Sequence, residues 1–151
     1  MAGKSFREFR DLYATLDPPE SPEGVWRGKP VGPGWFVKLA GPGLALGGLG
    51  GWWGKDFDGQ GGIDNLLERD GALRRTLPGK VREAASLLDG KPCQRIEYPK
   101  GSRLPWIWAV DELRQVGEGK LLGMMVLNVR GLPHLAFPFT LRAREDVEGL
   151  E

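Results

Sequence analysis

Short apolar runs broken by glycine and proline are the feature that most restricts the folds open to this chain. Glycine and proline supply 24 and 12 of its 151 residues, a content that approaches the range of disordered chains. Six tryptophans and six phenylalanines are spread among them, and such large aromatic side chains stabilise a protein mainly when they are buried. The combination predicts a folded, mainly β domain with many turns.

One amphipathic helix is predicted near the N-terminus, over residues 5–16. Apolar side chains recur there at helical spacing, and Ser5 and Glu8 form the pattern of a capping box. The prolines at 18–19 end this helix because proline cannot continue the backbone hydrogen-bond ladder. Residues 81–88 favour a second helix or an irregular segment, since their apolar period is ambiguous.

Short strands are predicted along most of the remaining chain. In the N-terminal half they cover residues 24–29, 34–39 and 52–57, with a flexible glycine-rich loop over 41–51 and an irregular or briefly helical segment over 63–73. In the C-terminal half five apolar runs are separated by turn residues, Asp111 and Glu112 among them; the runs are 93–98, 104–110, 113–116, 121–129 and 135–143. Five such runs in sequence predict an antiparallel meander. We expect one domain over residues 1–151, with an element at 24–58 and a meander at 93–143.

Charge and cysteine content exclude several classes of protein. The 21 basic and 20 acidic side chains leave a net charge of +1, so we expect no nucleic-acid partner. Cys93 is the single cysteine; it excludes an internal disulfide, fits a reducing compartment, and reads as a buried apolar residue. No apolar run of about 18 residues occurs. The sequence therefore predicts a cytoplasmic protein without a membrane partner, and a homodimer is compatible with it.

Several motifs fall in an order that resembles a known family. Residues 24–28 read Gly-Val-Trp-Arg-Gly, which is a GxWxG motif, and residues 52–57 read Trp-Trp-Gly-Lys-Asp-Phe. With the later segments 95–98, 111–116, 121–125 and 137–142, these elements resemble a bacterial family named for the GxWxG motif. The resemblance spans most of residues 6–145, although the glycine-rich segment 41–51 departs from the family.

The resemblance implies a fold and a set of structural residues. The motif is similar to the GxW of lipocalins and to the GxWxG of nitrobindin-like haem proteins, which implies a calycin-like, lipocalin-like antiparallel β-barrel around an internal cavity. Gly24 and Gly28 would allow close backbone approach, and Trp26 would close one end of the barrel. By analogy with lipocalin-like barrels, Arg142 would pack on Trp26 through a cation–π contact.

Aromatic side chains on the predicted strands suggest a wall for an apolar ligand. Trp106 and Trp108, two residues apart, should share one face of a strand. Lys55 could pair with an anionic head group. The predicted ligand wall comprises Trp52, Trp53, Lys55, Trp106, Trp108, Phe137 and Phe139. The favoured hypothesis is therefore a protein that binds a small hydrophobic molecule and needs no cofactor.

Two further hypotheses stay open at the level of sequence. No Walker A loop, GxSxG elbow or multi-histidine metal pattern occurs, so conventional hydrolase, kinase and zinc chemistry is set aside. The first alternative is a cofactor-independent cyclase or isomerase acting on a polyketide-like or terpenoid-like substrate, with Asp111 or Tyr98 assisting proton transfer. The second is a haem protein in which His134, the single histidine, is the proximal iron ligand.

Overall fold

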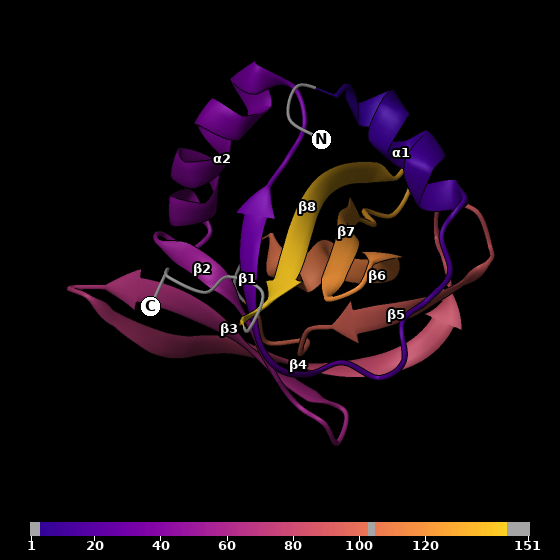
Figure 1. The fold of residues 1–151 in the computed structure, drawn as a ribbon. Helices are drawn as coiled ribbons and strands as arrows, with labels where there is room; N and C mark the ends of the chain where they lie inside the picture. The colour runs from indigo at the N-terminus through magenta and orange to yellow at the C-terminus, as the bar shows by residue number, and fades with distance from the viewer. Residues whose placement is uncertain (1–3, 103–104, 145–151) are drawn as a thin grey trace.

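The protein folds as a closed antiparallel β-barrel, seen in Figure 1. The computed structural model describes residues 4–102 and 105–144. Each strand pairs with the next along the chain, and β8 returns to pair with β1. The strands are β1 (Glu23–Pro30), β2 (Trp52–Asp58), β3 (Gly62–Arg69), β4 (Ala72–Ala85), β5 (Pro92–Glu97), β6 (Ala109–Gly117), β7 (Lys120–Leu127) and β8 (Leu135–Ala143). This confirms a mainly β fold built on a small antiparallel barrel.

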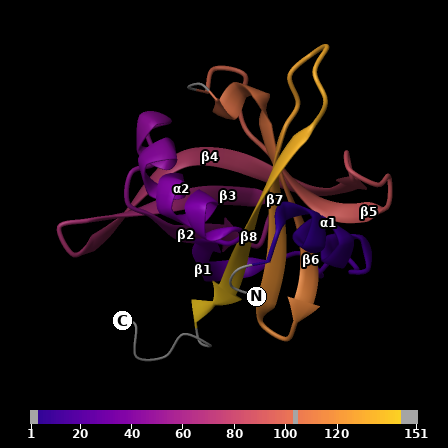
Figure 2. The ribbon, with the colours of Figure 1, turned by 90° about the horizontal axis from the view of Figure 1, so that it is seen from above.

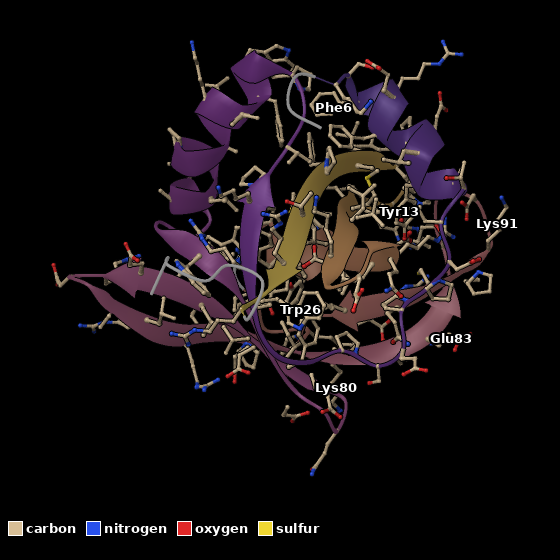
Figure 3. The ribbon with its side chains drawn as sticks, in the orientation of Figure 1. Phe6, Tyr13, Trp26, Lys80, Glu83 and Lys91 are labelled. Atoms are coloured by element: carbon tan, nitrogen blue, oxygen red, sulfur yellow. The ribbon has the colours of Figure 1, made fainter. Side chains whose placement is uncertain are left out.

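The N-terminal helix is also confirmed, as α1 (Phe6–Ala14). Its capping box is complete, because the Ser5 hydroxyl accepts from the Glu8 backbone N–H and the Glu8 carboxylate accepts from the Ser5 N–H. Phe9 and Tyr13 are buried against the outer face of β7. Figure 3 shows Tyr13 directed from α1 towards the barrel. The helix thus covers part of the barrel wall.

A second helix, α2 (Gly34–Leu46), replaces the strand predicted at 34–39 and most of the loop predicted at 41–51. Every side chain of α2 is at least partly exposed, and the helix continues through Pro42. Aromatic packing holds its start, since Phe36 stacks on Phe137 at 5.5 Å and meets the edge of Phe6 at 5.1 Å. Tertiary contacts here override the low helix propensity of glycine and proline. None of the described helices is long and apolar enough to cross a membrane.

Both helices flank one side of the barrel. Figures 1 and 2 show α1 and α2 on either side of β1 and β8, and Figure 3 places Phe6 in the space between the helices. The ring of Phe6 lies 5.7 Å from that of Trp35 and 6.0 Å from that of Phe137. This aromatic contact joins the two helices to β8.

Four further sequence predictions are corrected by the structure. Residues 63–73, predicted as irregular or briefly helical, form most of β3, the turn after it and the start of β4. Residues 81–85, predicted as helix or irregular, lie in β4. The predicted turn at 111–112 lies inside β6. The predicted strand 104–110 gives way to a 3-10 helix, η1 (Trp106–Trp108), followed by β6; residues 103–104 lie outside the described residues. Apolar runs this short do not distinguish a strand from a helical turn.

The barrel interior is divided between its two ends. One end, near the β2–β3 and β6–β7 hairpins, is filled by an apolar cluster that includes Phe57, Ile63, Leu113, Leu121 and Leu141. The opposite end holds a smaller cluster in which Leu49, Leu67 and Trp106 pack with Leu44 of α2. Because neighbouring strands are antiparallel, the start of β2, the start of β6 and the end of β7 meet at this second end. The interior is therefore packed at one end, while α2 and η1 flank the other.

The GxWxG motif supports the packed end and the wall beside it. Gly24 has φ +80°, a conformation that favours glycine. A Cβ on Gly28 would lie 2.3 Å from the Trp52 ring, so only glycine leaves room for that indole. Trp26 is partly buried and packs against the apolar cluster. The predicted Arg142–Trp26 contact is wrong: Trp26 pairs with Ala143, and Arg142 is exposed and pairs with Arg27, so their side chains leave opposite faces of the sheet.

Candidate functional site

A partly open cavity of about 280 Å³ lies at the α2 end of the barrel. Its wall is mainly apolar and takes residues from α2, η1 and several strands, among them Leu44, Trp52, Trp106, Met125, Phe137 and Phe139. Four polar side chains also line it: Lys55, Asn65, Tyr98 and Asp111, which we call the polar quartet. An apolar cavity with a few convergent polar groups is the usual form of a small-molecule site, although typical volumes begin at about 300 Å³.

A β-bulge explains how β2 presents two of these residues. Strict alternation would place Trp52 and Lys55 on opposite faces of the strand. The pairing of β2 with β3 shifts between Trp52 and Gly54, which is the mark of a bulge. As a result Trp52 and Lys55 both line the cavity, whereas Trp53 does not. The bulge is therefore part of how the site is built.

Lys55 is the centre of the polar quartet. Its Nζ donates to Asn65 Oδ1 at 2.8 Å, to the Tyr98 hydroxyl at 2.9 Å and to Asp111 Oδ2 at 2.8 Å. The Lys55 and Asp111 side chains are only 3% and 5% exposed. The ammonium also lies 5.7 Å from the ring centroids of Trp52 and Phe139, within the range of a cation–π contact. Hydrogen bonds and ring faces together compensate the desolvation of the charge.

Tyr98 joins the same network through a short hydrogen bond. Its hydroxyl donates to Asp111 Oδ2 at 2.5 Å. Burial, followed by the charge of Asp111, raises the pKa of Tyr98 well above its ordinary value. The phenol therefore stays protonated at neutral pH and acts as a hydrogen-bond donor.

Asn65 is the member of the quartet that sequence reasoning missed. Its Oδ1 accepts from Lys55 and from the Trp52 indole N–H, at 2.8 and 3.1 Å, while its Nδ2 donates to the Leu77 carbonyl at 3.1 Å. Leu77 has φ +43°, which is uncommon for a branched residue. The sequence does hold a usable signal, because Asn65 falls between Ile63 and Leu67 on the apolar face of an alternating run.

The structure sorts the other predicted ligand-binding residues into two groups. Trp52, Lys55, Trp106, Phe137 and Phe139 line the cavity together with the predicted catalytic residues Tyr98 and Asp111. Trp53 instead packs under the Arg27 guanidinium, 5.1 Å from its ring centroid. Trp108 is 44% exposed. A 3-10 helix turns once in about three residues, so Trp106 and Trp108 point in different directions and do not share a face.

Both ring nitrogens of His134, the residue of the haem hypothesis, have partners within the protein. His134 is absent from the cavity lining, and its two ring nitrogens lie 3.3 Å from the Leu87 carbonyl and 2.9 Å from Asn128 Oδ1. Among the described residues, no group of three or more His, Cys, Asp or Glu is arranged to hold a metal ion. His134 and the cavity are therefore separate features of the described structure.

A second buried polar cluster lies on the outer face of β6 and is structural. Glu112 accepts from the hydroxyls of Tyr13 and Ser86, at 3.1 and 2.6 Å. Arg114 forms a bidentate pair with Asp89 at 2.7 and 2.8 Å and covers the Tyr13 ring at 4.2 Å. The Arg114 guanidinium lowers the pKa of Asp89 to about 2. These contacts tie α1 and the β4–β5 turn to the barrel.

Cys93 is fully buried. Burial, and then the charge of Glu112, raises the pKa of this thiol to about 11. The thiolate is the reactive form of cysteine, so Cys93 is suited to packing and not to nucleophilic chemistry.

Comparison with known proteins supports the fold and does not assign a family. No family model and no curated protein matches the sequence. A solved protein from Thermomonospora curvata is similar in structure, with a TM-score of 0.64, coverage of 93% of this chain and 90% of that chain, and 22% sequence identity. At that identity the likeness concerns the fold alone: this chain shares the architecture of the Thermomonospora protein.

Proposed function

We propose that the protein binds a small, mainly apolar molecule inside the barrel. The observation that carries this proposal is the cavity at the α2 end, whose wall is formed by Trp52, Trp106, Met125, Phe137 and Phe139 around one compact polar quartet. A ligand that covers this apolar wall stabilises the complex by roughly 25 cal/mol for each Å² of apolar surface removed from water. The quartet supplies the polar contact that would orient the ligand.

Two leucines of α2 allow a matched test of this proposal. Leu44 lines the cavity, whereas Leu46, on the same helix, is 82% exposed. Leu44→Trp should fill part of the cavity, and Leu46→Trp adds the same indole outside it. Titration with an environment-sensitive apolar fluorophore should show affinity at least about tenfold weaker for Leu44→Trp and unchanged for Leu46→Trp. Equal affinity of both variants and the wild type would place the probe on the surface and contradict the proposal.

Proton-transfer catalysis on a bound substrate is a second candidate function. It is favoured by the position of Tyr98 and Asp111, which face the same cavity and share a 2.5 Å hydrogen bond. Such a pair can assist an isomerisation or cyclisation of an apolar substrate held in a reactive conformation. Conversion of substrate by the wild type, with turnover lost in Asp111→Asn and binding retained, would distinguish the enzyme from the binding protein.

We also propose that the chain is a member of the GxWxG family. Support comes from contacts between its first two motif segments: Gly28 lies under the ring of Trp52, and Trp26 is the cross-strand partner of Lys55. An alignment of homologues in which Gly28 and Trp52 change together would support membership. Independent variation of the two positions would count against it.

A further inference from the structure

The charged groups of the cavity cancel one another. Among the described residues that line the cavity, two are charged: Lys55 and Asp111. The Lys55 Nζ and Asp111 Oδ2 atoms lie 2.8 Å apart. A ligand carboxylate near this pair would be attracted to Lys55 and repelled by Asp111, and a ligand ammonium would meet the opposite balance. Either ion would be desolvated without a free counter-charge, which is costly. The pair therefore disfavours charged ligands of both signs.

The hydrogen-bond inventory of the quartet favours one kind of neutral group. All three N–H bonds of the Lys55 ammonium are taken by other members of the quartet. The Tyr98 hydroxyl donates to Asp111 Oδ2. The Asn65 amide has two N–H bonds, of which one donates to the Leu77 carbonyl at 3.1 Å and the other to the Tyr98 hydroxyl at 3.4 Å. The Asp111 carboxylate, in contrast, accepts hydrogen bonds from Lys55 and Tyr98 at Oδ2. Within the described part of the chain, no side-chain hydrogen bond reaches its other oxygen. Its second oxygen, Oδ1, is an acceptor that still has capacity.

We propose that the ligand is an uncharged apolar molecule whose polar end is a hydroxyl group that donates to Asp111 Oδ1. This inference deepens the proposed binding function and rests on it. A ketone or ether of the same size has no proton to donate, and the donors of the quartet are already in use. A hydroxyl instead adds a hydrogen bond to a carboxylate, which is among the stronger hydrogen bonds in proteins.

The test is a comparison of four straight-chain probes of eight carbons: octanol, octanone, octanoate and octylammonium. Isothermal titration of the wild type should rank octanol first, with octanone, octanoate and octylammonium each weaker by about tenfold or more. Octanoate or octanone binding as tightly as octanol would overturn the inference and leave the proposed function standing. Absence of binding by all four probes would overturn both.

Substitution of Asp111 should change the ligand preference in a predictable direction. Asp111→Asn leaves the Lys55 charge without its counter-ion, so affinity for octanoate should rise and the octanol-to-octanoate affinity ratio should fall by at least about tenfold. Asp64→Asn is the matched control, since Asp64 lies beside Asn65 on the opposite face of β3 and is 37% exposed. An unchanged ratio in a folded Asp111→Asn protein would contradict the role given to Asp111.

A second variant covers the case in which Asp111→Asn does not fold. Lys55→Met combined with Asp111→Leu removes both charges and leaves an apolar wall, an exchange that proteins often tolerate. This protein should still bind octanol and octanone, with the preference for octanol reduced to less than about threefold. A preference that survives at its wild-type size would show that another group recognises the hydroxyl.

Discussion

Lys55 and Asp111 connect opposite walls of the barrel through the 2.8 Å contact between Nζ and Oδ2. Lys55 belongs to β2 and Asp111 to β6, which are four strands apart in either direction around the ring. The ion pair therefore crosses the interior at the point where the packed end meets the cavity. The same two side chains therefore join opposite strands of the barrel and form part of the cavity wall.

The buried pair should show strong coupling in a double-mutant cycle. Loss of one partner leaves the other charge buried and uncompensated, so Lys55→Met or Asp111→Leu alone should lower the free energy of unfolding by about 3–5 kcal/mol. The double variant should recover most of that loss. Urea denaturation of the four proteins measures the cycle.

The Arg75–Asp56 pair provides a surface control for this cycle. The Arg75 side chain is 61% exposed, so water screens its interaction with Asp56. The same cycle on Arg75 and Asp56 should give a coupling far smaller than that of the buried pair. Comparable coupling at the two sites would show that Lys55 and Asp111 are not effectively buried in solution.

Gly28 should be intolerant of even one added carbon. A Cβ at this position would lie 2.3 Å from the Trp52 ring, so Gly28→Ala has to displace a cavity-wall residue and should destabilise the protein by about 1–3 kcal/mol. Gly41, in α2, would place an added Cβ in open space, with nothing within 4 Å, and Gly41→Ala should be neutral or slightly stabilising. Thermal denaturation of the two variants and the wild type measures this difference in stability. Equal melting temperatures for Gly28→Ala and Gly41→Ala would contradict the close packing of Gly28 against Trp52.

Both tyrosines of the chain, Tyr13 and Tyr98, should resist ionisation until the protein unfolds. Burial raises the pKa of each above its ordinary value of 10. Because the folded state holds these protons more tightly than the unfolded state, stability is intact below pH 10 and decreases as the pH rises beyond it. Tyrosinate absorbance should therefore appear together with loss of the β-sheet circular dichroism signal. A tyrosinate signal from protein that keeps its fold would contradict the burial of Tyr98.

Asp89 should contribute to loss of stability in acid. Arg114 lowers the pKa of Asp89 from 3.8 to about 2. A carboxyl with a depressed folded-state pKa stabilises the protein above its unfolded pKa, and this contribution is lost as the pH falls towards 2. Urea midpoints measured across that window should fall less steeply for Asp89→Asn than for the wild type. Parallel pH profiles would show that the Arg114–Asp89 pair is not formed in solution.

Local sequence signals are sufficient for the parts of the fold bounded by turn chemistry. The strands predicted at 24–29, 52–57, 93–98, 121–129 and 135–143 lie within or overlap β1, β2, β5, β7 and β8. The capping box at Ser5 and Glu8 locates α1. Each of these signals acts over a few residues, so no knowledge of the tertiary structure is needed.

Sequence reasoning fails where long-range contacts decide the outcome. The helix α2 contains glycine and proline and is held by Phe36 against Phe137 and by Leu44 against the barrel. The strand predicted at 104–110 would put Trp106 and Trp108 on one face, but the 3-10 helix η1 forms at these residues instead. Lys55 and Asp111 are each candidates from the sequence, but nothing local links β2 to β6. The site exists only once the barrel has closed around it.

The six tryptophans allow the central claim to be tested one residue at a time. Indole N–H signals in a heteronuclear NMR spectrum, assigned by single Trp→Phe variants, would be followed during titration with octanol. Trp52 and Trp106 line the cavity, whereas Trp35 and Trp108 are 60% and 44% exposed outside its lining. Binding inside the barrel predicts saturable shifts at Trp52 and Trp106 and little change at Trp35 and Trp108. Shifts confined to Trp35 and Trp108, or no shifts at any of the six, would contradict it.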